Sequence, residues 1–430
     1  MPLLSSQSGI SAKALGLTSS QFAAFGDGYW GQVLTNATVN TIATSRNPSV
    51  DSSGNVYVGG WYNPASSPTV SDIYALKVNS SGVLQWSNRF TTPQPDTGYV
   101  STINSSNDLF IAGPSGSSTA GTLIKYNSAG TFQWAKNFIG SWTNVFPNAI
   151  KTDSSGNIYV AGFSYTGATN VYDAFTIKFD STGAIVWQRF LGGVQFEGFD
   201  GIAIDGSGNV YVSGLRAQSP NTGMVAKYNS SGVLQWQKEL SYPSVSMQIG
   251  DMAIDSSGNI YIPGYLLGRG ILFKFDSSGN LTWQKTLVST AAQYLGIAID
   301  PSDYIYVVGG IDLTTRVILK YDSSGNNIFR RTLTGGSPIG ICVDSSSMYI
   351  ACKSSATDTF ELFKLPSNGS KTGAYKIGSF DITYTSFSDT DNNGVAVLST
   401  TTFTDSAGNF TVSASPGTSV SDSFTQIIQY

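Results

Sequence analysis

A short turn sequence followed by alternating apolar residues recurs along the chain, and this repeat constrains the fold more than any other feature. The clear copies read Asp-Ser-Ser-Gly-Asn or Asp-Gly-Ser-Gly-Asn and begin at Asp51, Asp153, Asp205 and Asp255. Weaker copies begin at Asn104, Asp300, Asp344 and Asp405. The first side chain caps the turn, glycine accepts a positive φ, and the alternation that follows has the period of a β-strand. The repeat therefore predicts an all-β chain of eight similar units.

A second signature lies between these turns and defines the rest of each unit. It is a strand that carries a lysine, a Ser/Gly turn and a strand that begins near a tryptophan. Clear copies run from Lys77 to Trp86, Lys125 to Trp134, Lys178 to Trp187, Lys227 to Trp236 and Lys274 to Trp283. The copy from Lys320 to Phe329 has phenylalanine in place of the tryptophan, and Lys364 begins a degenerate copy. Four short antiparallel strands in units 44 to 53 residues apart are typical of β-propeller blades.

The two ends of the chain predict how the ring closes. Residues Trp30 to Leu34 match the fourth strand of a unit but follow no first three strands, whereas Phe403 to Tyr430 supply three strands without a fourth. We therefore expect eight four-stranded blades, with the N-terminal strand completing the last one. The 61-residue spacing before Asp405 leaves an alternative of seven blades with a C-terminal β appendage. Residues 29–430 then form the propeller, and 1–28, which show no strand period, form a docking arm.

The two signatures resemble the SBBP-type β-propeller repeat from about Trp30 to Tyr430. That resemblance implies a structural or adhesive protein without shared catalytic residues. With the short segment from Leu3 to Leu17 in front, the repeats are also similar to those of tailed-phage virion proteins, particularly from marine phages. The chain departs from the pattern in its eighth unit, which lacks the lysine, and in its sixth to eighth units, which lack the tryptophan.

The second resemblance implies a non-enzymatic virion structural protein, tail-associated as a fibre or adhesin, or decorating the capsid. Its partners would be other virion proteins, through the N-terminal arm, and a host surface glycan. The alternatives are a secreted or cell-surface glycan-binding propeller of a bacterium and, more remotely, a propeller glycosidase or lyase. A glycosidase needs two carboxyl groups facing one cleft. Glu197 and Asp200, on one predicted loop, are the candidates for that pair.

Composition excludes several other functions. The chain contains no histidine, which removes Ser-His-Asp triads, Cys-His dyads and histidine-ligated zinc. A net charge of −4 without a basic patch argues against nucleic acid as a partner. No apolar run is long enough for membrane insertion, and the N-terminus lacks the basic start of a secretory signal. These features favour the virion as the location, with the extracellular space or a cell surface as the alternative.

Three further sets of residues are candidates for chemistry. The repeated lysines are interpreted as stems packed along a blade, with a ring of cations for an anionic glycan as the other reading. Asp389, Asp391 and Asn393 match the start of an acidic calcium loop, although no Glu stands at its twelfth place. Calcium is thus the one cofactor considered, and we expect folding without it. Cys342 and Cys352 flank a predicted hairpin turn, where two packed thiols are favoured over a disulfide.

Aromatic residues in the variable loops are candidate contacts for a glycan or a protein partner. Such rings stack on sugars or anchor a partner when they are exposed, and they cover the blade below when they are not. The candidates are Trp61, Tyr62, Trp142, Tyr165 and Tyr172.

Overall fold

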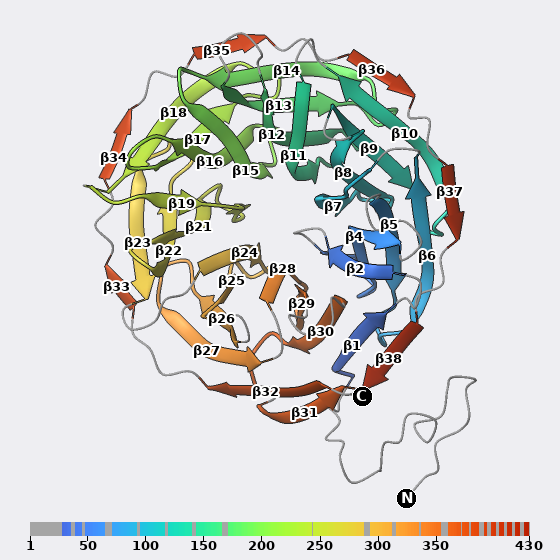
Figure 1. The fold of residues 1–430 in the computed structure, drawn as a ribbon. Helices are drawn as coiled ribbons and strands as arrows, with labels where there is room; N and C mark the ends of the chain where they lie inside the picture. The colour runs from blue at the N-terminus through green and yellow to red at the C-terminus, as the bar shows by residue number, and fades with distance from the viewer. Residues whose placement is uncertain are drawn as a thin grey trace, which may run out of the picture.

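Seven antiparallel sheets surround a central channel in the computed structural model (Figure 1). The structure describes residues 28–35, 39–44, 48–64, 71–92, 95–116, 119–139, 143–165, 171–242, 244–287, 293–311, 315–334, 337–353, 360–370, 372–377, 380–386, 391–393, 397–400, 404–407, 411–414, 418–421 and 425–429. Each sheet is one blade, and its strands follow the chain order from the channel outwards because tight turns join neighbouring strands. The prediction of eight blades is wrong, and the alternative of seven blades is confirmed.

The second to fourth strands of the blades have 6 to 9 residues, whereas the innermost strands vary from 2 to 10. In blades 1 to 3 the ring strands are β2 (Val39–Thr44) with β3 (Ser49–Val50), β4 (Val56–Pro64), β5 (Asp72–Val78) and β6 (Leu84–Thr91); β7 (Val100–Ile103), β8 (Leu109–Ser115), β9 (Ala120–Tyr126) and β10 (Phe132–Ile139); and β11 (Thr143–Thr152), β12 (Ile158–Tyr165), β13 (Tyr172–Phe179) and β14 (Ile185–Gly192). In blades 4 and 5 they are β15 (Phe196–Ile204), β16 (Val210–Ala217), β17 (Thr222–Tyr228) and β18 (Leu234–Ser241); and β19 (Met247–Ile249) with β20 (Ala253–Ile254), β21 (Ile260–Leu266), β22 (Arg269–Phe275) and β23 (Leu281–Leu287). In blades 6 and 7 they are β24 (Gln293–Ile299), β25 (Ile305–Gly310), β26 (Thr315–Tyr321) and β27 (Asn327–Thr334); and β28 (Ser337–Val343), β29 (Ser347–Lys353) and β30 (Phe360–Pro366).

The N-terminal strand completes the last blade, as the sequence predicts. β1 (Trp30–Thr35) pairs with β30 as the fourth strand of blade 7, with Trp30 opposite Lys364. The indole of Trp30 is fully buried and donates from Nε1 to the carbonyl of Ser80 in blade 1, at 3.0 Å. The first described strand therefore closes the ring between its last and first blades.

The same contact recurs around the ring and holds neighbouring blades together. Tryptophans of the fourth strands donate to a serine carbonyl in the next blade's second turn, as Trp187 does to Ser230 at 3.1 Å. Repeated lysines donate to the equivalent carbonyls, as in the pairs Lys77–Ser128, Lys227–Ser277, Lys274–Ser323, Lys320–Ser367 and Lys364–Ser80. Lys274 Nζ also lies 5.3 Å from the ring centre of Tyr261. The interpretation of these lysines as packed stems is confirmed, and we call this set of contacts the blade latch.

The hydrophobic core is divided into seven clusters, one at each interface between blades. Between blades 2 and 3, for example, the Phe138 ring lies 6.3 Å from Phe175 and 5.5 Å from Phe179. Every blade thus buries both of its faces against neighbours. A ring with one missing strand loses part of two of these interfaces.

The C-terminal segment runs around the outside of the ring and adds one strand to every blade (Figure 1). It visits blades 6, 5, 4, 3, 2, 1 and 7 in that order, opposite to the order in which the chain forms the ring. We call strands β32 to β38 the outer belt. The belt strands are β32 (Phe380–Ser386), which also pairs with β31 (Gly373–Ile377), β33 (Asp391–Asn393), β34 (Val397–Thr400), β35 (Thr404–Ala407), β36 (Thr411–Ala414), β37 (Thr418–Ser421) and β38 (Thr425–Gln429).

The outer belt explains why an eighth blade was predicted wrongly. The weak turn copy at Asp405 is not a turn, because Asp405 lies within β35 and pairs with Leu191 of blade 3. Strand β38, taken from the sequence as a third strand, pairs with β1 outside the last blade, with Gly31 opposite Gln429. The ends of the described chain are therefore hydrogen-bonded neighbours, but β1 is the fourth of five strands rather than the outermost.

Candidate functional site

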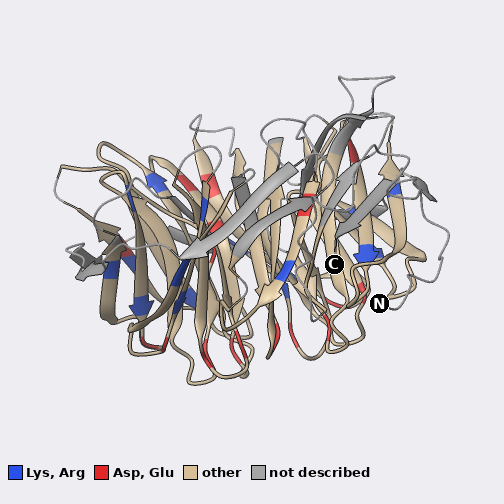
Figure 2. Cartoon of the chain, turned by 90° about the horizontal axis from the view of Figure 1, so that it is seen from below, with Lys and Arg blue, Asp and Glu red and all other residues tan. Residues whose placement is uncertain are grey.

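The two faces of the ring differ in what their side chains do. The tight turns all lie on one face, here the turn face, and the loops that join second to third strands and successive blades lie on the other, here the loop face. Figure 2 shows acidic residues at the tips of the tight turns along one edge of the disc. On that face the repeated side chains are engaged in holding turns and blades.

Asp51 illustrates how these turn carboxylates are used. It accepts hydrogen bonds from the backbone N–H of Ser53 and Asn55, each at 2.9 Å, from Asn55 Nδ2 at 2.8 Å and from the Tyr57 hydroxyl at 3.2 Å. Asp153 and Asp205 make the same set of contacts. Burial alone would raise the pKa of these carboxyls, but the hydrogen bonds outweigh it and hold each pKa below its usual value. Such carboxylates are structural.

An aromatic cluster on the loop face of blades 3 and 4 is the clearest candidate for a binding surface. Strand register brings its members together, because Phe146 pairs with Phe163 and Tyr165 pairs with Tyr172 across blade 3. Phe196, at the start of blade 4, completes the cluster with its ring centre 5.1 Å from that of Phe163. The ring centres of Phe146 and Phe163 lie 4.8 Å apart, and those of Tyr165 and Tyr172 lie 5.3 Å apart.

All five rings of this aromatic cluster are half-buried, so part of each faces solvent. Val194, in the turn that precedes Phe196, is 77% exposed. Exposed aromatic rings can stack on sugars or anchor a protein partner, and the two tyrosines of the cluster add a polar hydroxyl. The aromatic cluster therefore offers contact area that the repeat itself does not require.

Two carboxyl groups with raised pKa values lie beside the aromatic cluster. Burial raises the pKa of Asp173 to about 6. Burial, opposed by the Gly193 N–H and Arg216 and assisted by Asp173, raises the pKa of Glu197 to about 7. Glu197 is fully buried, and its Oε1 lies 3.3 Å from Arg216 Nε. Arg216 also contacts Glu239, at 3.4 Å, so that it lies between two glutamates.

The glutamates are therefore held by arginines rather than presented to a ligand. Glu361, the third glutamate of the chain, is fully buried with Arg316 in an ion pair. The sequence-based pair of Glu197 and Asp200 is likewise engaged, since Asp200 accepts a hydrogen bond from Asn148 Nδ2 at 3.0 Å. The nearest arrangement to an acid pair in this region is instead Asp173 with Glu197.

Of the predicted loop aromatics, the structure brings Tyr165 and Tyr172 together. Trp61 is half-buried in β4 of blade 1, away from this cluster in the strand order. Tyr62 pairs with Asp72 through its backbone, and its side chain and Trp142 lie outside the described residues. Sequence reasoning missed Phe146, Phe163 and Phe196. These three residues come together through strand pairing and blade packing, which can be recognised only once the strand register is known.

The calcium prediction remains untested. Asp391 and Asn393 lie in β33, where they pair with Leu287 and Lys285 of blade 5, and Asp389 lies outside the described residues. Among the residues that the structure describes, no three acidic or cysteine side chains gather to hold a metal ion. Both cysteines are free, as expected, with Cys342 opposite Tyr349 and Cys352 opposite Pro338.

Comparison with known proteins supports the propeller repeat. The SBBP β-propeller repeat family matches residues 133–171 and 235–265, which lie in blades 2 to 3 and 4 to 5. A search of curated proteins gives no significant match. Among the described residues, no helical segment has the length and apolar character needed to cross a membrane.

Solved structures that are similar to this chain are distant in sequence. The β-propeller domain of Cps50 (Swd1) from Myceliophteria thermophila is 9% identical, with 78% of this chain and 99% of that chain covered at a TM-score of 0.50. The Dos1 propeller is 12% identical, with coverages of 77% and 94% and a TM-score of 0.48. At 9% identity the likeness to the Cps50 domain concerns the fold alone. The chain is a β-propeller of seven blades, and its residues 133–171 and 235–265 match the SBBP β-propeller repeat.

Proposed function

We propose that this protein is a non-enzymatic interaction protein that binds a glycan through the aromatic cluster on its loop face. The observation that carries the proposal is the contrast between the faces: the turn-face carboxylates, lysines and indoles hold the ring, whereas the five cluster rings keep exposed area beyond what the repeat needs. Aromatic faces beside carboxyl groups are a common combination for holding sugar rings and their hydroxyls.

The arrangement of the acids supports binding rather than catalysis. A glycosidase acid must reach the glycosidic oxygen, and its partner carboxylate must face the same cleft. Glu197 is fully buried and tied to Arg216, which leaves Asp173 as the half-buried carboxyl beside the rings. One accessible carboxyl suits hydrogen bonding to a sugar hydroxyl. We therefore propose no catalytic step.

The finer proposal is a structural protein of a tailed-phage particle, tail-associated or decorating the capsid. The outer belt supports a role that needs durability, because it covers the fourth strand of each blade with a further antiparallel strand. The belt replaces the edge of each fourth strand with that of a shorter strand, and a short edge strand pairs less readily with another chain.

Residues 1–28 are proposed as the arm that docks onto other virion proteins. Of this segment only Gly28 is among the described residues. Deletion of 1–28 should leave the melting temperature unchanged and abolish incorporation into particles. Normal incorporation of the truncated chain would overturn the docking role.

Imaging of purified phage particles with a gold-labelled antibody tests the virion role. We expect labelling at one fixed location on each particle. A chain that stays free in the lysate while the particles remain unlabelled contradicts this role. A glycan array probed with the same purified chain tests glycan binding itself, which we propose equally for the alternative, a propeller secreted or displayed by a bacterium.

A further inference from the structure

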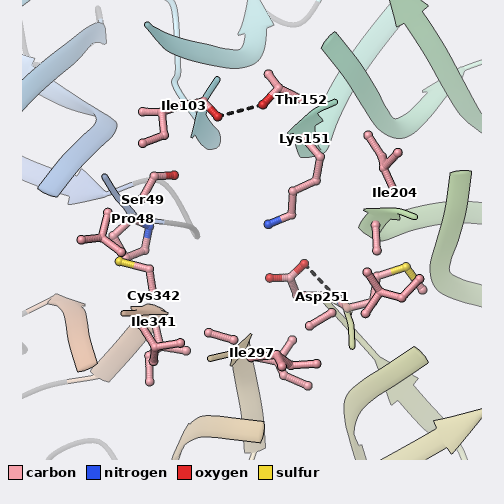
Figure 3. A pocket seen from close by; sticks show the side chains of 18 residues that line it. Pro48, Ser49, Ile103, Lys151, Thr152, Ile204, Asp251, Ile297, Ile341 and Cys342 are labelled. Atoms are coloured by element: carbon pink, nitrogen blue, oxygen red, sulfur yellow. Dashed lines mark hydrogen bonds between the residues drawn. The ribbon is translucent and has the colours of Figure 1, made fainter. Parts of the chain in front are cut away.

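A cavity of about 370 Å³ lies in the central channel, close to its turn-face end (Figure 3). The innermost strands of all seven blades contribute to its wall. This volume lies within the range typical of small-molecule sites, about 300–1,000 Å³. The cavity shares no residue with the aromatic cluster, and the inference below does not depend on the proposed function.

The backbone contributes polar groups to the wall of this cavity. Each innermost strand is the last of its sheet, so among the described strands it pairs only on the side away from the channel. Such an edge leaves N–H and C=O groups without a ladder partner, and here the edge faces the channel. Most side chains of the wall are aliphatic, yet its exposed surface is more polar than apolar. The wall therefore offers both hydrogen-bond donors and acceptors.

Lys151 adds a positive charge that the repeat does not require. It pairs with Tyr159 of the second strand, and blades 4, 5 and 6 have alanine in the same register, at Ala203, Ala253 and Ala298. Figure 3 shows the Lys151 side chain reaching into the cavity. Among the described residues, no hydrogen-bond or ion-pair partner is found for its ammonium. A ligand atom that accepts a hydrogen bond would supply that partner.

Asp251 adds a negative charge on another part of the wall. It stands four residues before the turn of blade 5, where blades 4, 6 and 7 have glycine. Its Oδ1 accepts the Met252 N–H at 2.8 Å, and the residue takes part in a further interaction. Figure 3 shows its carboxylate facing the cavity. Asp251 is therefore a negative group that the chain holds in place, and a carboxylate with about four acceptor positions can bond to a ligand as well.

These features together favour one class of ligand. Lys151 and Asp251 are the charged residues of the wall, so the wall has no net charge and favours a neutral ligand over an anion or a cation. A surface that is more polar than apolar disfavours a hydrocarbon, which could not bond to its polar groups. Hydroxyl groups both donate and accept hydrogen bonds, which matches the ammonium, the carboxylate and both kinds of backbone group.

We propose that the channel cavity binds a single neutral sugar ring. Lys151 donates a hydrogen bond to one hydroxyl oxygen, Asp251 accepts one from a second hydroxyl, and the strand edges bond to the others. The aliphatic side chains of the wall contact the C–H groups of the ring. The residues differ from those of the aromatic cluster, so the two sites can fail separately.

Ligand-observed NMR of the full chain with D-glucose, D-galactose and D-mannose tests this proposal, and calorimetric titration measures the affinity of those that bind. We expect at least one of the three to bind. Its 2-amino and 6-carboxylate forms should bind at least about tenfold more weakly, because each adds a charge that the neutral wall does not complement. Cyclohexanol, which keeps a six-membered ring but has one hydroxyl, should also bind more weakly. Absence of binding by all three sugars, or tighter binding of a charged form or of cyclohexanol, overturns the proposal.

Variants test the role of each charge. Lys151→Ala introduces the residue that three other blades carry, so it should fold, and it should weaken binding of the neutral sugar at least about tenfold. Asp251→Asn gives the wall a net positive charge, so the 6-carboxylate form should become the preferred ligand. Lys178→Ala, at the repeated lysine of blade 3 outside the cavity, is the matched control and should bind normally. Unchanged binding in Lys151→Ala, or an unchanged charge preference in Asp251→Asn, contradicts the proposal.

The Tyr165→Ala/Tyr172→Ala double variant separates this site from the aromatic cluster. It should bind the neutral sugar with unchanged affinity, because neither ring lines the cavity. Loss of sugar binding in the double variant, together with normal binding in Lys151→Ala, would place the sugar at the aromatic cluster and overturn the channel site.

Discussion

The turn face and the loop face belong to the same seven blades, yet their carboxylates behave in opposite ways. On the turn face, hydrogen bonds hold the pKa values of Asp51 and Asp153 below normal despite their burial. On the loop face, burial raises the pKa of Asp173 to about 6 and that of Glu197 to about 7. The difference shows that recurring residues hold the ring together, whereas residues particular to one blade are where binding should be sought.

Removal of the strand that closes the ring should have the largest effect. A chain without residues 1–36 loses β1, the partner of both β30 and β38, and with it the closed interface between blades 7 and 1. We expect it to lose cooperative unfolding, whereas the chain without 1–28 melts like the full protein. Thermal unfolding followed by tryptophan fluorescence measures both. Equal melting of the two truncations would show that β1 does not close the ring.

Two tryptophans compare the faces directly. Trp30→Ala removes a fully buried indole and its bond to Ser80, which should cost about 3 to 5 kcal/mol in the free energy of unfolding. Trp61→Ala, at a half-buried residue at the loop-face end of β4, should cost about 1 kcal/mol. Urea denaturation gives both values. Similar losses of unfolding free energy at the two positions would contradict the view that the turn face, unlike the loop face, holds the ring together.

Two glycines in turns of blade 4 sharpen the account of the blade latch. Gly232 has a φ of +77°, and a Cβ there would lie 2.6 Å from the Trp187 indole. Gly232→Ala should therefore cost about 1 to 3 kcal/mol. Gly206→Ala is the control, because a Cβ there meets nothing within 4 Å. This variant should change the free energy of unfolding by about 0.5 kcal/mol at most. A harmless Gly232→Ala in the same denaturation assay would show that the latch tolerates displacement.

The pH dependence of stability should differ between the faces. Glu197 has a folded pKa of about 7 against 4.5 for the free group, so the folded state binds more protons and stability falls as pH rises through this window. The turn aspartates act oppositely, because their folded pKa values lie below 3.8 and their contribution is lost as pH falls through those values. Glu197→Gln should flatten the fall in stability between pH 4.5 and about 7 and leave the loss of stability below pH 3.8 unchanged. An unaltered pH dependence of stability in that range would show that the buried Glu197 carboxyl does not cause it.

The sequence predicted the repeated parts of this fold well, because each repeat carries its own local signal. The turn at Asp51 and the strand that begins at Trp30 were both recognisable from residue type and spacing. The outer belt was misread as an eighth blade because Asp405 begins a turn-like sequence but is used in a strand. A signal was nevertheless present, since β34 to β38 begin at Val397, Thr404, Thr411, Thr418 and Thr425, each seven residues after the last.

The candidate site was less predictable than the fold. Tyr165 and Tyr172 were identifiable as aromatic residues at the ends of a variable loop. Phe196 of blade 4 meets Phe163 and Tyr172 of blade 3 only through the packing of one blade on the next, which no local pattern encodes.

The most direct test measures glycan binding and stability on the same two variants. The Tyr165→Ala/Tyr172→Ala double variant removes two rings of the aromatic cluster, and Lys274→Ala removes a turn-face lysine that bonds to Ser323 at 2.7 Å. With a ligand identified on the glycan array, we predict that the double variant loses binding by at least about tenfold with little change in stability. Lys274→Ala should instead lose stability and bind normally. Unchanged glycan binding in the double variant would contradict the account.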